Sequence, residues 1–278
     1  MDDIRKKHPK ILMEQMIVTH DKIHSIYQNT NGTEFEVYEG AYSVSLMYSA
    51  HEGEATTSFF GSDIYTDKLD RPFIELGSLE KDLSDTEAQL STVPMEGKFE
   101  GVIVLTPGSL GEFLGSIISN FASDNVILEK TSIWLEKLGR QVADERLTIS
   151  MCPGDSRIVC GQRYTQDGFL AEDYDLIRNG VLKSFLLSLY VANKSGFAPA
   201  RNTSFSVIIE NGDTSCEDMI RQIKKGLIIG RFSGGQPGIN GEFSGVAKNS
   251  FLVEDGRIRG AVSETMINGN LADLLNNL

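Results

Sequence analysis

Residues 225–275 read KGLIIGRFSGGQPGINGEFSGVAKNSFLVEDGRIRGAVSETMINGNLADLL, a pattern that predicts short strands joined by glycine-rich turns. An apolar strand, Leu227 to Ile229, leads into a loop with many glycines. The Asp255-Gly256 pair further on predicts a two-residue turn between two more strands. Because glycine costs chain entropy, a folded protein keeps it where the backbone needs a positive φ or a close approach. The loop therefore suits either a bound ligand or a set of tight turns without one. Its glycines are Gly230, Gly234, Gly235, Gly238, Gly241 and Gly245.

The charge balance of the 278-residue chain limits the possible partners. It has 26 basic and 39 acidic residues, a net charge of −13. This charge opposes a phosphate backbone, so we expect no direct binding of nucleic acid. The first residues, MDDIRKKHPK, lack the apolar core of a signal peptide, and no apolar run reaches the length of a membrane span. We expect no membrane association and a cytoplasmic location.

Upstream of the glycine-rich run, the apolar pattern first has a period of two and then a helical period. The Asn31-Gly32 pair predicts a hairpin turn. From residue 109 apolar side chains recur at helical spacing, and Ser109 with Glu112 is typical of a capping box. The predicted fold class is α+β, with large antiparallel or mixed β-sheets and a few packed helices. We expect one region over residues 1–95 and a domain over residues 96–278. The predicted elements are strands at 17–29, 34–38, 41–50 and 54–60 and helices at 80–90 and 109–121.

The residue types that carry chemistry form no recognisable catalytic set. His20 and His24 are four residues apart, but on a strand their rings would lie about 13 Å from each other, too far to share a metal ion. Three cysteines, Cys152, Cys160 and Cys216, show no CxxC spacing. Buried structural thiols fit Cys152 and Cys160 better than a Cys–His pair, although spacing alone leaves such a pair open. From the residues we predict no catalytic group, no metal site and no cofactor.

Three runs, in order, resemble the C-terminal half of the TldD/PmbA family. The resemblance covers residues 95–278 and extends to residues 17–61 as the end of the family's N-terminal region. It implies a two-subunit peptidase that trims or degrades small unfolded peptides in the bacterial cytoplasm. Members of the family are also described as modulators of DNA gyrase. The runs are TSIWLEKLGRQVADERLTI (131–149), DGFLAEDYDLIRNGVLKSFLLSLYVANKSG (167–196) and GEFSGVAKNSFLVEDGRIRGAVSETMINGNLADLL (241–275).

The chain departs from the family pattern where a zinc site would be. TldD-type members carry HExxxH on a helix that follows a strand, and a later cysteine completes the site. The equivalent helix here, Leu110 to Phe121, has Gly111-Glu112-Phe113-Leu114-Gly115-Ser116 at that place, without a histidine. The loop RFSGGQPGING also lacks a cysteine. The resemblance is therefore to the metal-free PmbA or TldE type. Members are usually longer at both ends, so we expect a fragment or a shortened paralogue.

Two classes of function follow from the resemblance. In the first, the chain is the metal-free subunit of a TldD/TldE-type peptidase, and its glycine-rich loop pairs with an extended peptide. The partner is then a TldD-type metal-bearing subunit or a second copy of the chain. In the second, the chain is a self-associating, non-enzymatic scaffold that binds peptides or modulates gyrase. The candidate substrate-binding residues are Gly234, Gly235, Gln236, Gly238, Glu242, Phe243, Ser244 and Gly245.

Overall fold

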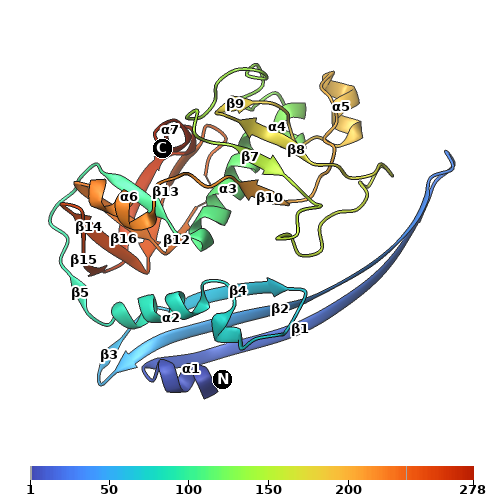
Figure 1. The fold of residues 1–278 in the computed structure, drawn as a ribbon. Coiled ribbons are helices and arrows are strands. Elements are labelled where there is room, and N and C mark those ends of the chain that lie inside the picture. The colour runs from blue at the N-terminus through green and yellow to red at the C-terminus, as the bar shows by residue number, and fades with distance from the viewer. Residues whose placement is uncertain (1, 236) are drawn as a thin grey trace.

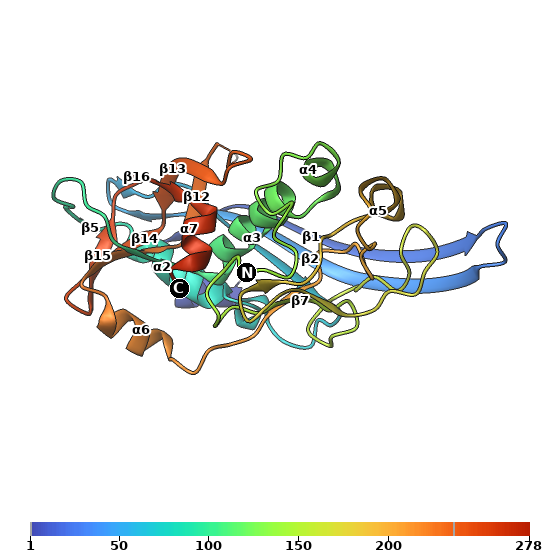
Figure 2. The ribbon, with the colours of Figure 1, turned by 90° about the horizontal axis from the view of Figure 1, so that it is seen from above.

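The computed structural model describes residues 2–235 and 237–278, and its fold is α+β, as predicted (Figure 1). An N-terminal sheet lies on one side of the molecule, and the elements from residue 92 onward form the other side (Figure 1). The long strands β1 and β2 sweep out beyond the rest of the chain (Figure 2).

The N-terminal sheet consists of β1 (Ile11–Gln28), β2 (Glu34–Glu52), β3 (Ala55–Thr56) and β4 (Phe60–Thr66). β1 and β2 pair antiparallel as far as Gln28 and Glu34, so the hairpin predicted from Asn31-Gly32 is confirmed. The prediction of two strands at 34–38 and 41–50 is wrong, because β2 runs through Gly40 without a break. A glycine inside a strand weakens it but does not end it when the ladder continues on both sides.

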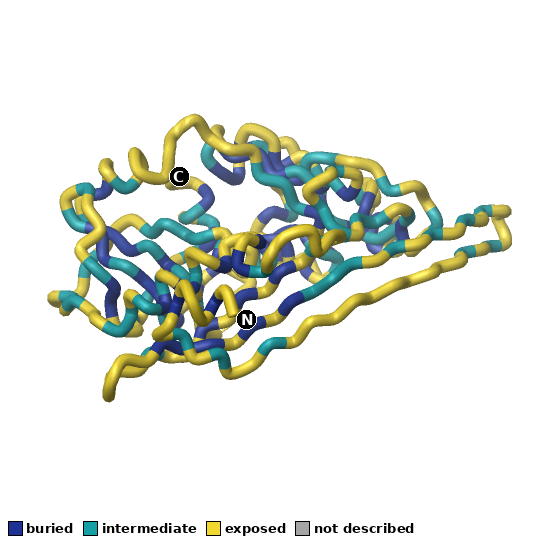
Figure 3. The backbone as a smooth tube through the Cα atoms, turned by 60° about the horizontal axis from the view of Figure 1, so that its bottom comes forward, coloured by how far each residue is buried: buried dark blue, intermediate teal, exposed yellow. Residues whose placement is uncertain are grey.

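One face of this sheet carries the N-terminal core. Alternate residues of β2, Val44, Leu46 and Tyr48, are buried against Leu79 and Leu83. These two leucines belong to α2 (Leu79–Ala88), which follows the short 3-10 helix η1 (Phe73–Glu75). The helix α1 (Asp2–Lys7) contributes Ile4 to the same cluster. β1 itself is exposed along most of its length (Figure 3).

The remaining strands form three sheets. The five-stranded sheet has the order β5 (Thr92–Val93), β15 (Arg257–Val262), β14 (Ser250–Glu254), β11 (Lys225–Ile229) and β6 (Val102–Leu105). The three-stranded sheet has the order β12 (Arg231–Gly234), β13 (Glu242–Lys248) and β16 (Thr265–Asn270). The four-stranded sheet has the order β10 (Val207–Ile209), β7 (Ile149–Met151), β8 (Tyr174–Arg178) and β9 (Val181–Leu182).

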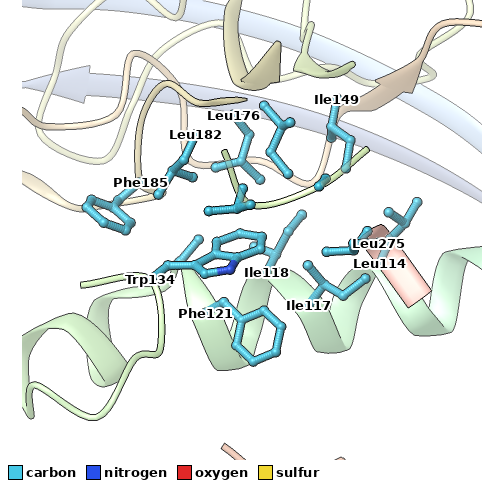
Figure 4. Close-up of a cluster of buried hydrophobic side chains, with 14 of the residues drawn as sticks. Leu114, Ile117, Ile118, Phe121, Trp134, Ile149, Leu176, Leu182, Phe185 and Leu275 are labelled. Atoms are coloured by element: carbon cyan, nitrogen blue, oxygen red, sulfur yellow. The ribbon is translucent and has the colours of Figure 1, made fainter. Parts of the chain in front are cut away.

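The helix α3 (Pro107–Phe121) is the centre of the largest core (Figure 4). Its predicted apolar stripe is confirmed, because Leu114, Ile117, Ile118 and Phe121 are buried. They pack against Trp134 and against apolar side chains of β7 to β9 and of α7 (Leu271–Asn276). Further helices are α4 (Asp124–Leu128), α5 (Leu189–Ser195) and α6 (Cys216–Gln222).

The capping box predicted for α3 is wrong. The helix begins earlier, with Thr106 as the N-cap and Pro107 in the first turn, a position that suits proline because its missing N–H needs no partner there. The buried Ser109 hydroxyl instead donates to the carbonyl oxygen of Ile229, at 2.9 Å, and ties α3 to the end of β11. Glu112 is therefore left without a structural role at the helix start.

Candidate functional site

A concave feature lies between α3 and β12. We call it the α3–β12 hollow, and its cavity volume is about 530 Å³. One wall is the side of α3 opposite its apolar stripe, and the other is β12 with the loop that follows it. Glycines and serines make up much of the described lining, so little side-chain bulk fills the hollow. The lining residues are Glu112, Phe113, Gly115, Ser116, Ser119 and Asn120 of α3 and Phe232, Ser233, Gly234, Gly235 and Pro237 of the other wall.

A second hollow of about 490 Å³ continues the first toward the start of α3. We call it the α2–α3 hollow, because α2 and β4 close it from the N-terminal side. Its α3 wall runs from Pro107 to Glu112, and its other wall includes Gly230 and Arg231. The two hollows therefore follow one another along α3, with residues 107–120 on one side and residues 230–235 and 237 on the other.

Glu112 is the residue that lines both hollows. Its side chain is exposed at their junction, yet the surrounding protein removes enough water from the carboxyl group to raise its pKa. The Arg231 guanidinium opposes this shift and lowers the pKa in part. Among the described residues that line the α3–β12 hollow, Glu112 is the one with an ionisable side chain.

The predicted substrate-binding residues fall into three groups. Gly234 and Gly235 line the α3–β12 hollow. Gln236 lies outside the described residues. Gly238 closes the loop, because its N–H donates to the carbonyl oxygen of Glu242 at 2.9 Å. Gly234 and Gly235 thus belong to the rim of the hollow, and Gly238 lies further along the same loop.

The other predicted residues lie on β13, where side chains alternate between the two faces of the sheet. Phe243 is buried and meets Phe113 and Phe232 edge to face, with ring centroids 5.2 and 5.7 Å apart. Gly245 lies beneath the same Phe232 ring, so a Cβ there would meet it at 2.5 Å. Phe243 and Gly245 thus support the wall of the hollow from behind. Glu242 and Ser244 are exposed on the opposite face of the sheet.

Sequence reasoning missed the α3 wall because a capping role was assigned to Glu112. The signal that could have revealed it is the run of small residues at Gly111, Gly115, Ser116 and Ser119. These positions leave the face of α3 opposite the leucines and isoleucines without bulky side chains. The small side chains on this face leave the space that the two hollows occupy.

The donor atoms at this site do not fit a zinc ion. Zinc prefers imidazole, thiolate and carboxylate ligands in a tetrahedral set. The described lining of the α3–β12 hollow offers Glu112 with serine hydroxyls and an amide. Across residues 2–235 and 237–278, no group of three or more histidine, cysteine, aspartate or glutamate side chains is placed to hold a metal ion.

The histidines and cysteines lie elsewhere. His20 and His24 stack on Tyr42 and Tyr38, with centroids 4.3 and 4.2 Å apart. The prediction of a buried thiol is wrong for Cys160, which is exposed, as is Cys216. Cys152 is half-buried, and burial raises the pKa of its thiol. In the described part of the chain, no helix combines the length and the apolar character that a membrane crossing requires.

A comparison with protein-family models matches residues 99–278 to the family described as PmbA/TldA metallopeptidase C-terminal domain. The match includes both walls of the α3–β12 hollow and leaves out the N-terminal sheet.

Individual relatives agree with this match. The chain is 30% identical over 200 residues to a metalloprotease of Methanothermobacter thermautotrophicus, and this alignment covers 66% of this chain and 43% of the relative. It is 30% identical over 177 residues to the metalloprotease PmbA of Escherichia coli O157:H7, and that alignment covers 62% of this chain and 37% of the relative. The chain thus spans less than half the length of these two relatives.

A solved structure shows the same fold over nearly the whole chain. TldE from Thermococcus kodakarensis superposes with a TM-score of 0.82 at 22% identity, covering 99% of this chain and 64% of that one. The long β1–β2 hairpin and the domain that carries the hollow thus belong to one known architecture.

Proposed function

Because the chain belongs to the PmbA/TldD family, we propose that it is a TldE-like subunit of a TldD/TldE-type peptidase and holds small unfolded peptides for a metal-bearing partner. The observation that supports this role most directly is the α3–β12 hollow. Its wall is an edge strand, because β12 pairs with β13 on one side and with no other strand among the described residues. An extended peptide can add to such an edge through backbone hydrogen bonds.

The composition of the hollow supports binding rather than hydrolysis by this chain alone. Peptide hydrolysis at a metal needs a Lewis acid that polarises the carbonyl group and activates water. The positions that correspond to the histidines of the HExxxH pattern are Gly111 and Ser116. We therefore assign the chemical step to a TldD-type partner. At Gly235 a Cβ would meet no atom within 4 Å, so the space beside it is open to a substrate backbone, whereas Gly234 is required by packing against Gly245 and Phe232.

The experiment reconstitutes the two-subunit peptidase in a buffer that imitates the cytoplasm, because we place the complex in that compartment. The purified chain is mixed with a TldD-type subunit, and cleavage of an unfolded peptide is followed by mass spectrometry. We expect the mixture to form a stable complex and to cleave faster than the partner alone. A partner whose cleavage rate is unchanged by this chain would contradict the subunit role.

The hollow lacks the ligand atoms that a zinc ion prefers, and this also favours a second candidate, a non-enzymatic scaffold that binds peptides and associates with itself. The same reconstitution separates the two. A scaffold binds the peptide without the partner, shows a dimeric mass alone and leaves cleavage unaffected. Metal analysis of the purified chain is a further check, because stoichiometric zinc would contradict both candidates.

A further inference from the structure

The two hollows together have the length of a short extended peptide. Their α3 wall runs from Pro107 to Asn120, and a helix rises 1.5 Å per residue, so the groove is about 20 Å long. An extended chain rises about 3.3 Å per residue. The groove therefore has room for about six residues, whereas the α3–β12 hollow by itself has room for three or four.

The two hollows differ in charge, because several charged side chains line the α2–α3 hollow, whereas Glu112 alone is charged among the described lining of the α3–β12 hollow. Of the other carboxylates in the α2–α3 hollow, Asp82 accepts from the hydroxyls of Ser62 and Ser78, both at 2.9 Å, Asp85 pairs with Lys81 at 2.5 Å, and Asp63 is exposed. Glu112 has no such partner among the described residues, and Arg231 is the one cation that influences it. Arg231 lines the α2–α3 hollow and not the α3–β12 hollow.

A group that occupies the α3–β12 hollow therefore meets a negative charge at its inner end and neutral side chains elsewhere. A primary ammonium group fits this place, because it can donate hydrogen bonds to the carboxylate while the peptide backbone lies along β12. Charge-assisted hydrogen bonds of this kind are about twice as strong as neutral ones.

We propose that the groove is a site for extended peptides of about six residues and that Glu112 selects those with a primary ammonium group at the junction of the two hollows. This inference rests on the proposed peptide-holding function and names its substrate class. The ammonium group belongs either to a lysine side chain or to the free amino terminus of the peptide.

The test is a set of binding measurements by calorimetry on the full chain. Alanine peptides of three to eight residues, capped at both ends and with one lysine at each position in turn, are compared with matched glutamine peptides. A further series keeps the free amino terminus and has no lysine. We expect affinity to rise up to about six residues and then to level off. The best lysine or free-amine peptide should bind at least tenfold more tightly than its neutral counterpart.

Two variants connect this preference to the carboxylate. Glu112→Gln keeps the shape of the side chain and should remove the tenfold preference, so that lysine and glutamine peptides bind it equally. Glu129→Gln, an exposed glutamate at the end of α4 that lines neither hollow, is the matched control and should keep the preference. Circular dichroism confirms that both variants are folded.

The pH dependence of the preference for ammonium-bearing peptides is an independent test of the role of Glu112. As pH falls through the pKa of Glu112, the carboxylate is neutralised and the preference for the ammonium group should disappear. Burial raises this pKa, so the loss should begin at a higher pH than an ordinary glutamate would give. The Glu112→Gln variant should show no such change.

The outcomes separate the two proposals. Equal affinity for lysine and glutamine peptides in the wild type would overturn the selection by Glu112 and leave peptide holding intact. An affinity that stops rising at a peptide length of three residues would overturn the inference that the two hollows form one groove. Absence of binding by every peptide, with and without a TldD-type partner, would overturn the proposed function itself.

Discussion

Gly115 lies in the middle of α3, where alanine would make a better helix. Glycine costs up to about 1 kcal/mol relative to alanine inside a helix. A Cβ at this position would meet no atom within 4 Å, so packing does not require the glycine. Because Gly115 lines the α3–β12 hollow, the added methyl group would project into the space where the peptide is proposed to lie.

We therefore expect Gly115→Ala to increase the free energy of unfolding by about 0.5–1 kcal/mol and to weaken peptide binding. Urea denaturation and calorimetry measure the two effects. Ser84→Ala on the exposed face of α2 is the control, because it also favours the helix but lies outside both hollows. A Gly115→Ala protein that is more stable and binds peptides normally would remove Gly115 from the site.

Single residues show where sequence reasoning fails. Ser109 and Glu112 have the spacing of a capping box, but Pro107 moves the helix start upstream and leaves both free for other roles. A local pattern cannot indicate that the Ser109 hydroxyl reaches Ile229, 120 positions away in the chain. Gly234 and Gly235 could be predicted as candidates because a loop with so many glycines is costly in chain entropy unless the fold needs them. The α3 wall opposite them could not be predicted, because it is brought there by tertiary packing.

At the scale of elements, the distal half of the β1–β2 hairpin is a two-stranded arm. Residues 21–28 and 34–41 pair with each other and, in the described chain, with no third strand. An isolated two-stranded ribbon is marginally stable in water, so contacts at its end matter. Tyr27, Phe35 and Tyr164 form a continuous stack there, with centroids 4.7 and 3.6 Å apart, and Tyr164 belongs to the loop after β7.

We expect Tyr164→Ala to loosen the arm without unfolding the rest. An aromatic pair contributes about 0.5–1.5 kcal/mol, so hydrogen exchange of the arm amides should become about 2- to 10-fold faster. Exchange in β4 and α3 should not change. Tyr190→Ala, at an exposed tyrosine of α5 that takes no part in this stack, should leave the arm as it is. Unchanged exchange in the Tyr164→Ala arm would show that the ribbon is stable without this stack.

Elements with a strong periodic pattern were predicted well, and those that depend on distant pairing were not. The apolar stripe of α3 and the Asn31-Gly32 turn are local signals, and both are confirmed. The continuity of β2 through Gly40 and the edge position of β12 depend on which strands pair, and residue periodicity carries no such information. The groove is built between a helix and an edge strand, so its existence could be expected only from the family resemblance.

For the whole molecule, the main question is whether the N-terminal sheet and the domain with the hollow unfold together. The division at residues 95 and 96 stays a prediction. Buried bonds do cross between the two sides: the Asn249 side-chain amide donates to the Thr86 hydroxyl at 2.9 Å, and the Gln89 amide donates to the Ser250 carbonyl oxygen at 3.2 Å. The α2–α3 hollow also needs both sides, because α2 and β4 close it.

We expect Asn249→Gly to destabilise both sides by the same amount, about 1–3 kcal/mol, because it breaks a buried hydrogen bond that joins them. Glycine accepts the positive φ of 46° at this position, so the variant removes the hydrogen bond without adding backbone strain. Fluorescence of Trp134, the single tryptophan, reports the core around α3, and hydrogen exchange of β2 reports the N-terminal sheet. Asn211→Gly in an exposed loop is the control. If β2 opens at lower denaturant while the Trp134 transition stays in place, the two sides unfold independently, and a peptide bound across both hollows would have to hold them together.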